Sequence, residues 1–413
     1  MTHRKLWKKK TQEEIKHRIF SALKENVYYK EEYILGVPGS HLDEKVFPQE
    51  DVPFIADAPF ISTLVHNPNH IGCHTLGKSE SFFSGTQEIE RELIDICAVD
   101  ILKGKSGQQD GYVASGGTEA NLQAIWIYRN YFKQEFNASL EEICIITSED
   151  NHYSMDKAAN VLSIDVFKVD VVDHNREITH KSVQETLQKA INLGKKHFIV
   201  VVNMMTTMFG SVDSISCYIE ELSKLNLSFK IHVDGAYGGF YYPFSNPNNI
   251  LNFENSHIDS FTLDAHKMAQ APYGTGIFLI RKGLIQYANT KAGYVEGEDF
   301  TLIGSRSGAN AIAVWMILMK HGPFGWEEKI FILQKRTQWL CDQLSQLNIE
   351  FYRHPDANIV TIRNSYVSET IAKKYWLVPD NHQNPNWFKI VVMDHVTIEK
   401  LVPLIEDLKS NLR

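Results

Sequence analysis

The chain lacks the features that mark secreted, membrane-spanning and nucleic-acid-binding proteins. Its five cysteines among 413 residues form no C-x-x-C pair, so we expect reduced thiols and a cytoplasmic location. No apolar run approaches the roughly 20 residues of a transmembrane helix. The basic start MTHRKLWKKK lacks the apolar segment of a secretory signal. A net charge of −8 argues against a nucleic-acid partner, and Cys73-His74 has no further spaced ligands, so we predict no metal site.

Internal repeats and low-complexity tracts are also absent, and helices instead alternate with apolar strands. The strands are expected near residues 143, 166, 199, 230, 261 and 277. This alternation predicts an α/β fold with a mostly parallel sheet covered on both faces. Because the chain exceeds one typical core, we expect three parts: an N-terminal helix and extended arm (1–60), a large domain (61–305) and a smaller α/β C-terminal domain (306–413).

The two ends of the chain carry local signals of their own. Thr11 and Glu14 form a capping box that opens a helix. In the C-terminal part we expect one helix through GANAIAVWMILMKHG, another over Glu327–Leu347, and a last one from Thr397. Strands are expected near Phe351 and over residues 387–393.

A lysine in a turn between two strands is the most informative single residue. Lys267 lies in the run SFTLDAHKMAQAPYGTGIFLIRKG, after an apolar strand and before a second one, Gly276–Arg281. A lysine just past a strand's end can be partly removed from water, which makes its amine available for a Schiff base. A His-Lys pair alone is more often solvated surface, so the interpretation depends on other segments.

A glycine turn upstream could bind a phosphate. Residues 111–115 predict a strand, Gly116 and Gly117 a tight turn, and Thr118 the start of a helix whose buried stripe includes Leu122, Ile125 and Tyr128 or Trp126. Thr118 is a residue type that caps helices, and free N–H groups at a helix start bind anions. An ordinary strand–turn–helix connection remains the alternative.

An acid and a histidine also follow predicted strands. Asp234 ends the strand in KIHVDGAYGGF, where a buried carboxylate needs a cation or donor; a protonated pyridine nitrogen would serve, as would a simple turn cap. Ala236 is small enough for a flat ring to lie against it. His152 follows the strand Ile143–Thr147, near the start of a helix, and could stack on a ring and relay a proton. Thr207 adds a hydroxyl at the same level of the sheet.

The segments SGGTEAN, NHYS, HVDGAYGG and DAHKM, in this order, resemble the group II pyridoxal-phosphate-dependent amino-acid decarboxylases. The resemblance runs from about residue 60 to the C-terminus. The wording SGGTEANLQA, DAHKM and KIVVMDH looks most like the archaeal-type tyrosine/aspartate decarboxylases, while HYS and GSRSG are similar to bacterial histidine and plant serine decarboxylases. The resemblance implies the fold-type I (aspartate aminotransferase-like) architecture and pyridoxal 5'-phosphate as cofactor.

The resemblance also implies roles for individual residues. Lys267 would bind the cofactor covalently and Asp234 would pair with its pyridine nitrogen. His152 and Ala236 would contact the two faces of the ring, with Thr207 nearby. The residues implied at the phosphate are Gly117, Thr118, His266 and, from the neighbouring subunit, Ser305. Asp264 departs from relatives with Ser or Asn, and we expect it to turn away from the phosphate.

The function implied is α-decarboxylation of an L-amino acid to its amine and CO2 by a cytoplasmic homodimer with shared active sites. Two alternatives stay open: a carbon–carbon lyase or aldehyde-forming oxidative decarboxylase, and a silent homologue, against which the intact Lys267, Asp234 and His152 argue. Tyr294 is a candidate proton donor, with a surface tyrosine as the alternative. His74, Phe82 and Phe83 are candidate substrate contacts or dimer-packing residues. The phenylalanines favour an aromatic or imidazole substrate slightly over an acidic one, which His70, His74 and Lys78 could receive.

Overall fold

The computed structural model describes residues 6–26, 57–71, 76 and 80–412. Most of the predicted extended arm lies outside the described residues, as do Cys73, His74 and Lys78. Within the described residues, no helix is both long and apolar enough to cross a membrane.

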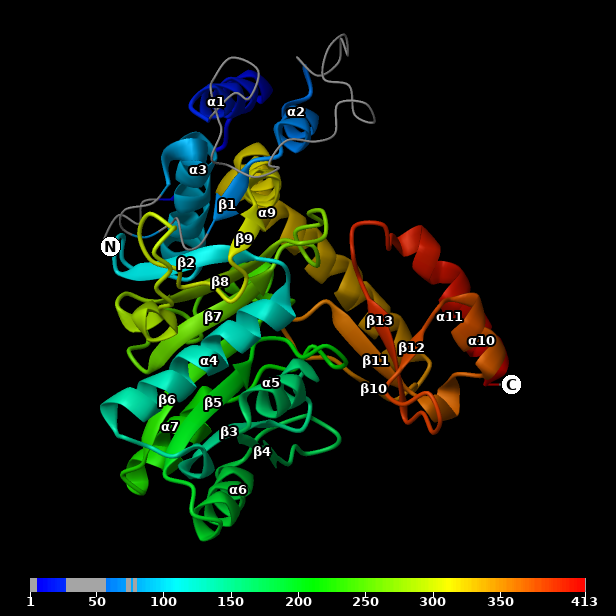
Figure 1. The fold of residues 1–413 in the computed structure, drawn as a ribbon. Helices are drawn as coiled ribbons and strands as arrows, with labels where there is room; N and C mark the ends of the chain where they lie inside the picture. The colour runs from blue at the N-terminus through cyan, green and yellow to red at the C-terminus, as the bar shows by residue number, and fades with distance from the viewer. Residues whose placement is uncertain (1–5, 27–56, 72–75, 77–79, 413) are drawn as a thin grey trace.

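The centre of the molecule is a seven-stranded sheet (Figure 1). One strand, β8, runs antiparallel to both its neighbours, and the other strands share one direction. In spatial order the strands are β2 (Gln109–Ala114), β8 (Gly276–Arg281), β7 (Ile258–Asp264), β6 (Ser228–Gly235), β5 (His197–Asn203), β3 (Ile143–Ser148) and β4 (Asp165–Val169). The predicted α/β fold with a mostly parallel sheet is confirmed, and each of the six expected apolar strands is present.

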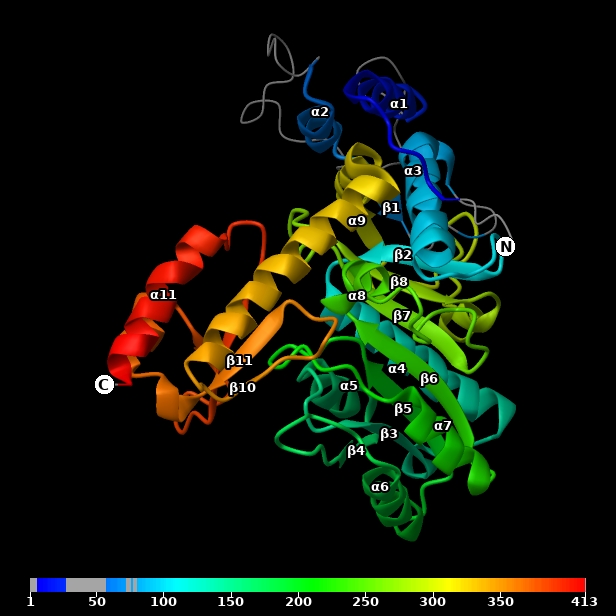
Figure 2. The same ribbon diagram turned by 180° about the vertical axis from the view of Figure 1, so that it is seen from behind.

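Both faces of this sheet are covered by helices (Figures 1 and 2). Successive side chains on a strand point to opposite faces, so Ile143 and Ile145 join one hydrophobic core whereas Cys144 and Ile146 join the other. The first face packs against α4 (Gly117–Glu135) and α5 (Ser154–Leu162). The second packs against α3 (Ser84–Asp95), α6 (His180–Asn192), α7 (Ile215–Lys224), α8 (Tyr242–Ser245) and the first part of α9 (Gly308–Gln346).

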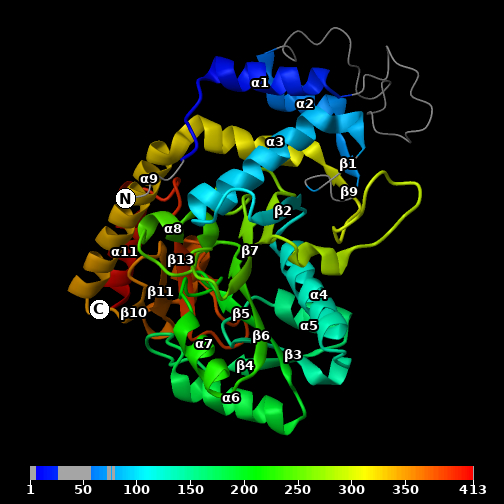
Figure 3. The ribbon, with the colours of Figure 1, turned by 90° about the vertical axis from the view of Figure 1, so that its left-hand side faces the viewer.

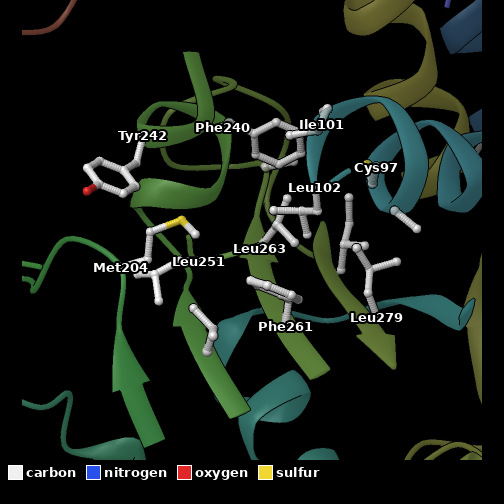
Figure 4. Close-up of a cluster of buried hydrophobic side chains, with 14 of the residues drawn as sticks. Cys97, Ile101, Leu102, Met204, Phe240, Tyr242, Leu251, Phe261, Leu263 and Leu279 are labelled. Carbon is white, nitrogen blue, oxygen red and sulfur yellow. The ribbon is translucent and has the colours of Figure 1, made fainter. Parts of the chain in front are cut away.

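The second core holds the carboxyl ends of the central strands in place. Figure 4 shows Phe261 and Leu263 of β7 packed with Leu279 of β8 and with Met204, just after β5. Leu102 closes the cluster from the segment after α3. Burying each large apolar side chain contributes roughly 1.5–3 kcal/mol, so the strand ends are held firmly where polar residues follow them.

The N-terminal helix forms as the sequence predicts. In α1 (Gln12–Lys24) the Thr11 hydroxyl accepts from the Glu14 N–H and the Glu14 carboxylate accepts from the Thr11 N–H. Its buried stripe includes Ile15, Ile19 and Leu23. With α2 (Pro59–His66), α1 lies across the end of the molecule formed by α3 and α9 (Figure 3).

A second, antiparallel sheet follows in the C-terminal part. Its strands, in spatial order, are β10 (Phe351–Tyr352), β11 (Ile359–Arg363), β13 (Trp387–Val391) and β12 (Val378–Pro379). Helices α10 (Glu369–Lys374) and α11 (Ile398–Asn411) pack on it together with the end of α9. The expected strands at β10 and β13 and the last helix are present, whereas β11, β12 and α10 are additions.

Helix α9 joins the two sheets and is bent at Gly322, with φ 63° and ψ 175°. Only glycine adopts this conformation readily, and an added Cβ would lie 2.5 Å from Lys9 Cβ. Two helical stretches therefore meet here, as predicted, although the second begins at Pro323 rather than Glu327. Side chains of α9 as far as Leu333 belong to the core of the large sheet, while Leu340 and Leu344 belong to that of the small sheet. The predicted domain boundary at 305/306 stays a prediction.

Candidate active site

The polar residues singled out in the sequence gather at one edge of the large sheet. Asp234 lies near the end of β6, Lys267 follows β7, and His152 follows β3. The glycine turn between β2 and α4 lies against the residues that follow β6. An added Cβ on Gly117 would be only 3.1 Å from Ala236 Cβ. Ligands bind at this edge in open α/β sheets, as the strand assignments had predicted.

Asp234 is buried, and its carboxylate is held on both oxygens. Oδ1 accepts from the Ala236 backbone N–H at 3.0 Å, and Oδ2 accepts from Asn121 Nδ2 at 2.8 Å. Because side chains alternate along β6, His232 faces the same side and packs beneath it. His232 Nε2 lies 3.0 Å from Asn121 Oδ1, and its burial lowers the pKa of His232 to about 4. The ring is therefore neutral near pH 7.

The expectation that Asp264 turns away is wrong. Its carboxylate is buried and faces the site, where Oδ2 accepts from the Gly117 N–H at 3.1 Å and lies 3.8 Å from Lys267 Nζ. His266 Nδ1 lies 2.7 Å from Asp264 Oδ1, outside hydrogen-bond alignment. Burial raises the pKa of Asp264, while the positive charge of Lys267 and that of His266 oppose the rise. The Gly117 N–H, Lys267 and His266 stabilise the buried carboxylate in place of water. The prediction considered only repulsion between Asp264 and a phosphate, and so did not include these partners.

The turn before α4 has the shape of an anion site. The helix begins at Gly117 with Gly116 as its N-cap, a residue without a side chain, and Asp264 engages only the first N–H, that of Gly117. Thr118 is therefore inside the first turn and not the cap. The first N–H groups of a helix have no partner within the helix. An added Cβ on Gly276 would lie 2.4 Å from the Gly116 carbonyl carbon, so β8 can approach the turn this closely only because residue 276 is glycine. Of the predicted stripe, Ile125 and Tyr128 are buried.

His152 lies two residues before α5 and is half-buried. Its Nδ1 lies 2.9 Å from Ser154 Oγ and accepts from the Ser154 N–H at 3.3 Å. Burial lowers the pKa of His152; the charge of Asp234 opposes this effect and that of Lys267 adds to it. Asp234 and Lys267 are therefore both near enough for their charges to act on the His152 ring.

Other predicted residues are not joined to this cluster in the described part of one subunit. The Thr207 side chain is exposed, and only its carbonyl is engaged, accepting from Lys389 Nζ at 2.9 Å. Tyr294 is 90% exposed in the loop before β9 (Ser305–Ser307), and Ser305 is exposed too. Phe83 is buried at the start of α3, beside the half-buried Phe82. His74 lies outside the described residues, so the substrate contacts stay predictions.

Sequence reasoning missed the residues that support this cluster. Asn121 and Ser154 link Asp234 to His152. Lys389 of β13 is near enough to Lys267 that burial and then the charge of Lys267 lower the pKa of Lys389. A signal existed for Asn121 and for His232, which packs beneath Asp234. Asn121 shares a helix face with Tyr128, seven residues on, and His232 shares a strand face with Asp234.

The family is decided by the match of residues 88–362, more than half of the chain, to the model of the pyridoxal-dependent decarboxylase conserved domain. The chain belongs to this family. It is therefore a pyridoxal-phosphate-dependent amino-acid decarboxylase of fold type I, and the resemblance drawn from the motifs is confirmed.

Two curated relatives and one solved structure show the range of similarity. The decarboxylase is 50% identical over 409 residues to the tryptophan decarboxylase of Clostridium sporogenes, covering 98% of each chain. It is 29% identical over 358 residues to a probable L-tyrosine/L-aspartate decarboxylase of Methanosarcina barkeri, covering 79% of this chain and 84% of the relative. An Oryza sativa protein named TDC, solved with PLP and tryptamine, superposes with a TM-score of 0.73 at 14% identity, covering 97% and 96% of the chains; this similarity shows the fold alone.

The residues at the sheet edge fit the cofactor. Lys267 has 31% of its side chain exposed, so its amine is accessible. Asp234 supplies a buried carboxylate whose oxygens are already oriented, and the first turn of α4 after Gly117 supplies N–H groups for a phosphate. These three features match the aldehyde, the pyridine nitrogen and the phosphate of pyridoxal phosphate.

Proposed function

We propose that this decarboxylase removes CO2 from an aromatic L-amino acid, with tryptophan as the first substrate to test. The observation that carries the proposal is the 50% identity with a tryptophan decarboxylase along almost the whole of both chains. Relatives named for tyrosine/aspartate and histidine are 28–29% identical over shorter shares. Two neighbouring phenylalanines at the start of α3, Phe82 and Phe83, favour the aromatic choice over an acidic one.

We further propose roles for the residues at the sheet edge. Lys267 binds the cofactor, Asp234 pairs with the pyridine nitrogen, and His152 and Ala236 contact its two faces. The start of α4 at Gly117 and Thr118 holds the phosphate together with His266, and Thr207 lies near the ring. These roles are supported by the contacts of Asp264 with Gly117 and Lys267. They are supported also by Ala236, which lies against Gly117 and donates its N–H to Asp234.

The chemistry divides between cofactor and protein. Bound pyridoxal phosphate supplies an electron sink for the electron pair left when the bond to CO2 breaks. The protein's part is to hold an ionised carboxylate at Asp234, to keep His152 neutral and able to move a proton, and to exclude water. Tyr294 is proposed to deliver the proton to the α-carbon, with its loop closing over the site.

A homodimer would bring this loop into the site. We propose that Ser305 reaches the phosphate of the neighbouring subunit, as in the resembling family. Exposed apolar side chains from α2 and from the loop before β9 would then be covered: Ile61, Leu64, Tyr294, Leu302 and Ile303 are each at least 40% exposed. A two-fold dimer is also the commonest oligomer.

A cytoplasmic location is part of the same proposal. The four cysteines that the structure describes, Cys97, Cys144, Cys217 and Cys341, are buried and unpaired. Reduced, buried thiols suit a reducing compartment.

The substrate proposal is tested with the purified holoenzyme and a panel of L-amino acids: tryptophan, tyrosine, phenylalanine, histidine, aspartate and glutamate. CO2, amine, aldehyde and hydrogen peroxide are measured for each. We expect CO2 and amine in equal amounts, with tryptophan giving the highest kcat/KM. Aldehyde with peroxide would establish the oxidative alternative, and cleavage without CO2 would establish a carbon–carbon lyase. A higher kcat/KM for aspartate would overturn the aromatic assignment.

The shared site is tested by mixing inactive subunits. A Lys267→Ala subunit combined with a Ser305→Asp subunit gives a heterodimer in which one site has an intact lysine and an intact serine from the neighbour. We expect activity to return on subunit exchange. The matched control combines Lys267→Ala with Asp234→Ala, which lie on the same wall, so neither site is complete and no rescue is expected. Equal behaviour of both mixtures, or a fully active monomer in sedimentation, would contradict the shared site.

A further inference from the structure

Asn121, in the second turn of α4, connects three parts of the site that are distant in the sequence. Its side chain is 1% exposed. Nδ2 donates to Asp234 Oδ2 at 2.8 Å and to Ser154 Oγ at 3.0 Å, and Oδ1 lies 3.0 Å from His232 Nε2. Both amide hydrogens and the amide oxygen are therefore engaged by buried partners.

These contacts fix where the hydrogens lie on the His232 branch. An ionised carboxylate only accepts, so the amide nitrogen must face Asp234 and the amide oxygen must face His232. His232 therefore carries its hydrogen on Nε2, and its neutral Nδ1 accepts from Ser260 Oγ at 2.7 Å. Ser260 Oγ in turn accepts from the Tyr128 hydroxyl. Every donor in this chain points toward Asp234.

The same reasoning applies to the second branch, toward His152. Ser154 Oγ accepts an Asn121 hydrogen, so its own hydrogen is free to go to His152 Nδ1 at 2.9 Å. The Ser154 N–H also donates to this nitrogen. With Nδ1 an acceptor twice, a neutral His152 carries its hydrogen on Nε2. Among the described residues, no hydrogen bond engages His152 Nε2.

We infer that Asn121 and Ser154 are positioning residues that couple the two functional groups of the site, holding the Asp234 carboxylate in place and fixing neutral His152 with its hydrogen on Nε2. The inference rests on the proposed roles of Asp234 and His152. In this inference a chain of hydrogen bonds runs from the Asp234 carboxylate through Asn121 and Ser154 to the His152 ring. Nε2–H is thereby the group of His152 left to donate a hydrogen bond to bound cofactor or substrate, and Nδ1 is not.

The variant that separates the two branches is Ser154→Ala. It removes the hydroxyl between Asn121 and His152 but leaves the Asn121–Asp234 hydrogen bond intact. We expect cofactor affinity to stay within about twofold and kcat to fall about two- to tenfold, the change that corresponds to losing one neutral hydrogen bond. Asn121→Asp, nearly the same shape, puts a second carboxylate against Asp234, and we expect it to weaken cofactor binding more strongly than Ser154→Ala does.

The decisive measurement is the position of the hydrogen on His152, read by NMR of holoenzyme with ¹⁵N-labelled histidine and assigned with His152→Phe. We expect the Nε2–H form in the wild type and a mixture of both forms in Ser154→Ala. Ser154→Thr, which keeps the hydroxyl, should restore the wild-type spectrum. Thr337→Ala is the matched control, because it removes a fully buried hydroxyl from α9, far from the site, and should leave His152 unchanged.

Two outcomes would overturn the inference. One is a wild-type His152 with its hydrogen on Nδ1, and the other is a Ser154→Ala protein whose His152 signals match those of the wild type. This readout does not depend on turnover. A protein whose His152 carries its hydrogen on Nε2 but which decarboxylates no amino acid would contradict the proposed function. The inference about Asn121 and Ser154 would still hold.

Discussion

The two walls of the site differ in how completely one subunit builds them. The sheet wall comprises His152, Asp234, Ala236, His266 and Lys267, and its polar groups are tied to strand ends by buried contacts. The loop wall, residues 289–305, carries Tyr294 and Ser305, both exposed. Within the loop, Thr290 and Asp299 form a β-bridge. Contacts with the rest of the described chain include the hydrogen bonds from Gln123 Nε2 to the Phe300 carbonyl and from the Glu296 N–H to the Glu80 carboxylate. The difference supports the proposal that a single chain prepares the cofactor's position, and that closure of the loop over the substrate needs a partner subunit.

The loop wall nevertheless ends at a firm anchor. Arg306, one residue after Ser305, pairs with the fully buried Glu90, which also lies 2.6 Å from His70 Nδ1 and accepts from the Val113 N–H at 2.7 Å. Burial alone would raise the pKa of Glu90, but the charges of Arg306 and His70 outweigh it, and the net pKa is well below the usual range. The register of β9 against β1 (Asn69–Ile71) is set beside this cluster.

The largest effect is expected at Lys267, on the sheet wall. Lys267→Ala removes the only proposed covalent attachment of the cofactor, and activity should fall on the order of 10⁴-fold or more, as when a catalytic unit loses its nucleophile. Borohydride should fix pyridoxal phosphate on the Lys267 peptide of the wild type, read by mass spectrometry. Lys282→Ala, which changes an exposed lysine after β8, is the control. Covalent cofactor elsewhere in the variant would refute the assignment.

Asp234→Ala tests the same wall by removing the carboxylate together with its hydrogen bonds to the Ala236 N–H and Asn121. Losing a buried charge partner costs about 3–5 kcal/mol, so kcat should fall roughly 10²- to 10³-fold while some cofactor remains bound. Steady-state kinetics and a cofactor titration separate the two effects. Asp156→Ala, at an exposed ion pair with Lys168, should change neither. A near-normal kcat in Asp234→Ala would mean that another group serves the pyridine.

Glu90→Gln tests the anchor of the loop wall. The change leaves Arg306 and His70 without the buried negative charge, so the free energy of unfolding should fall by about 3–5 kcal/mol, measured by urea denaturation. Because the pKa of Glu90 is lower in the folded state, its contribution is present above its unfolded pKa and is lost as the pH falls below that value. The difference between wild type and variant should therefore shrink in acid.

The same helix supplies a control for this prediction. Glu88 pairs with Arg18 at 3.3 Å and is 56% exposed, and exposed pairs contribute only about 0–1 kcal/mol. Glu88→Gln should therefore be nearly neutral. Equal losses of stability in both variants would show that burial does not distinguish the two pairs.

The smallest effect is expected at Ser305. Ser305→Ala removes one neutral hydrogen-bonding group proposed to reach the partner's phosphate, so cofactor affinity should weaken by about two- to tenfold. Ser307→Ala, two residues on in the same strand and also exposed, is the control. An unchanged cofactor dissociation constant in Ser305→Ala would contradict the proposed contact between Ser305 and the phosphate. It would leave the loop wall a role only toward the substrate.

Much of the fold could be predicted from short-range sequence patterns. Contacts between residues far apart in the sequence could not. The capping box at Thr11 and the apolar strands were predictable because each depends on near neighbours. Strand β11 forms because Ile359–Arg363 pairs with β13, and no short-range pattern marks that pairing. Asp264 was misjudged for the same reason: the donor that holds it, the Gly117 N–H, lies 147 residues earlier. Asn121 could be recognised as polar on a buried face, but not as the link between Asp234 and His152.

The way α9 crosses between the two cores has a consequence for protein engineering. A chimaera that exchanged everything after residue 305 with a relative would replace Trp315, Leu318, Trp326 and Leu333, which fill the core of the large sheet. A graft that leaves these residues in place, with its junction between Leu333 and Leu340, would exchange the small sheet alone. Lys389 of β13 would be transplanted with the small sheet, and its hydrogen bond to the Thr207 carbonyl would cross the junction between the two parts. Measuring the substrate specificity of such grafts would show whether the small sheet contributes to the choice of amino acid.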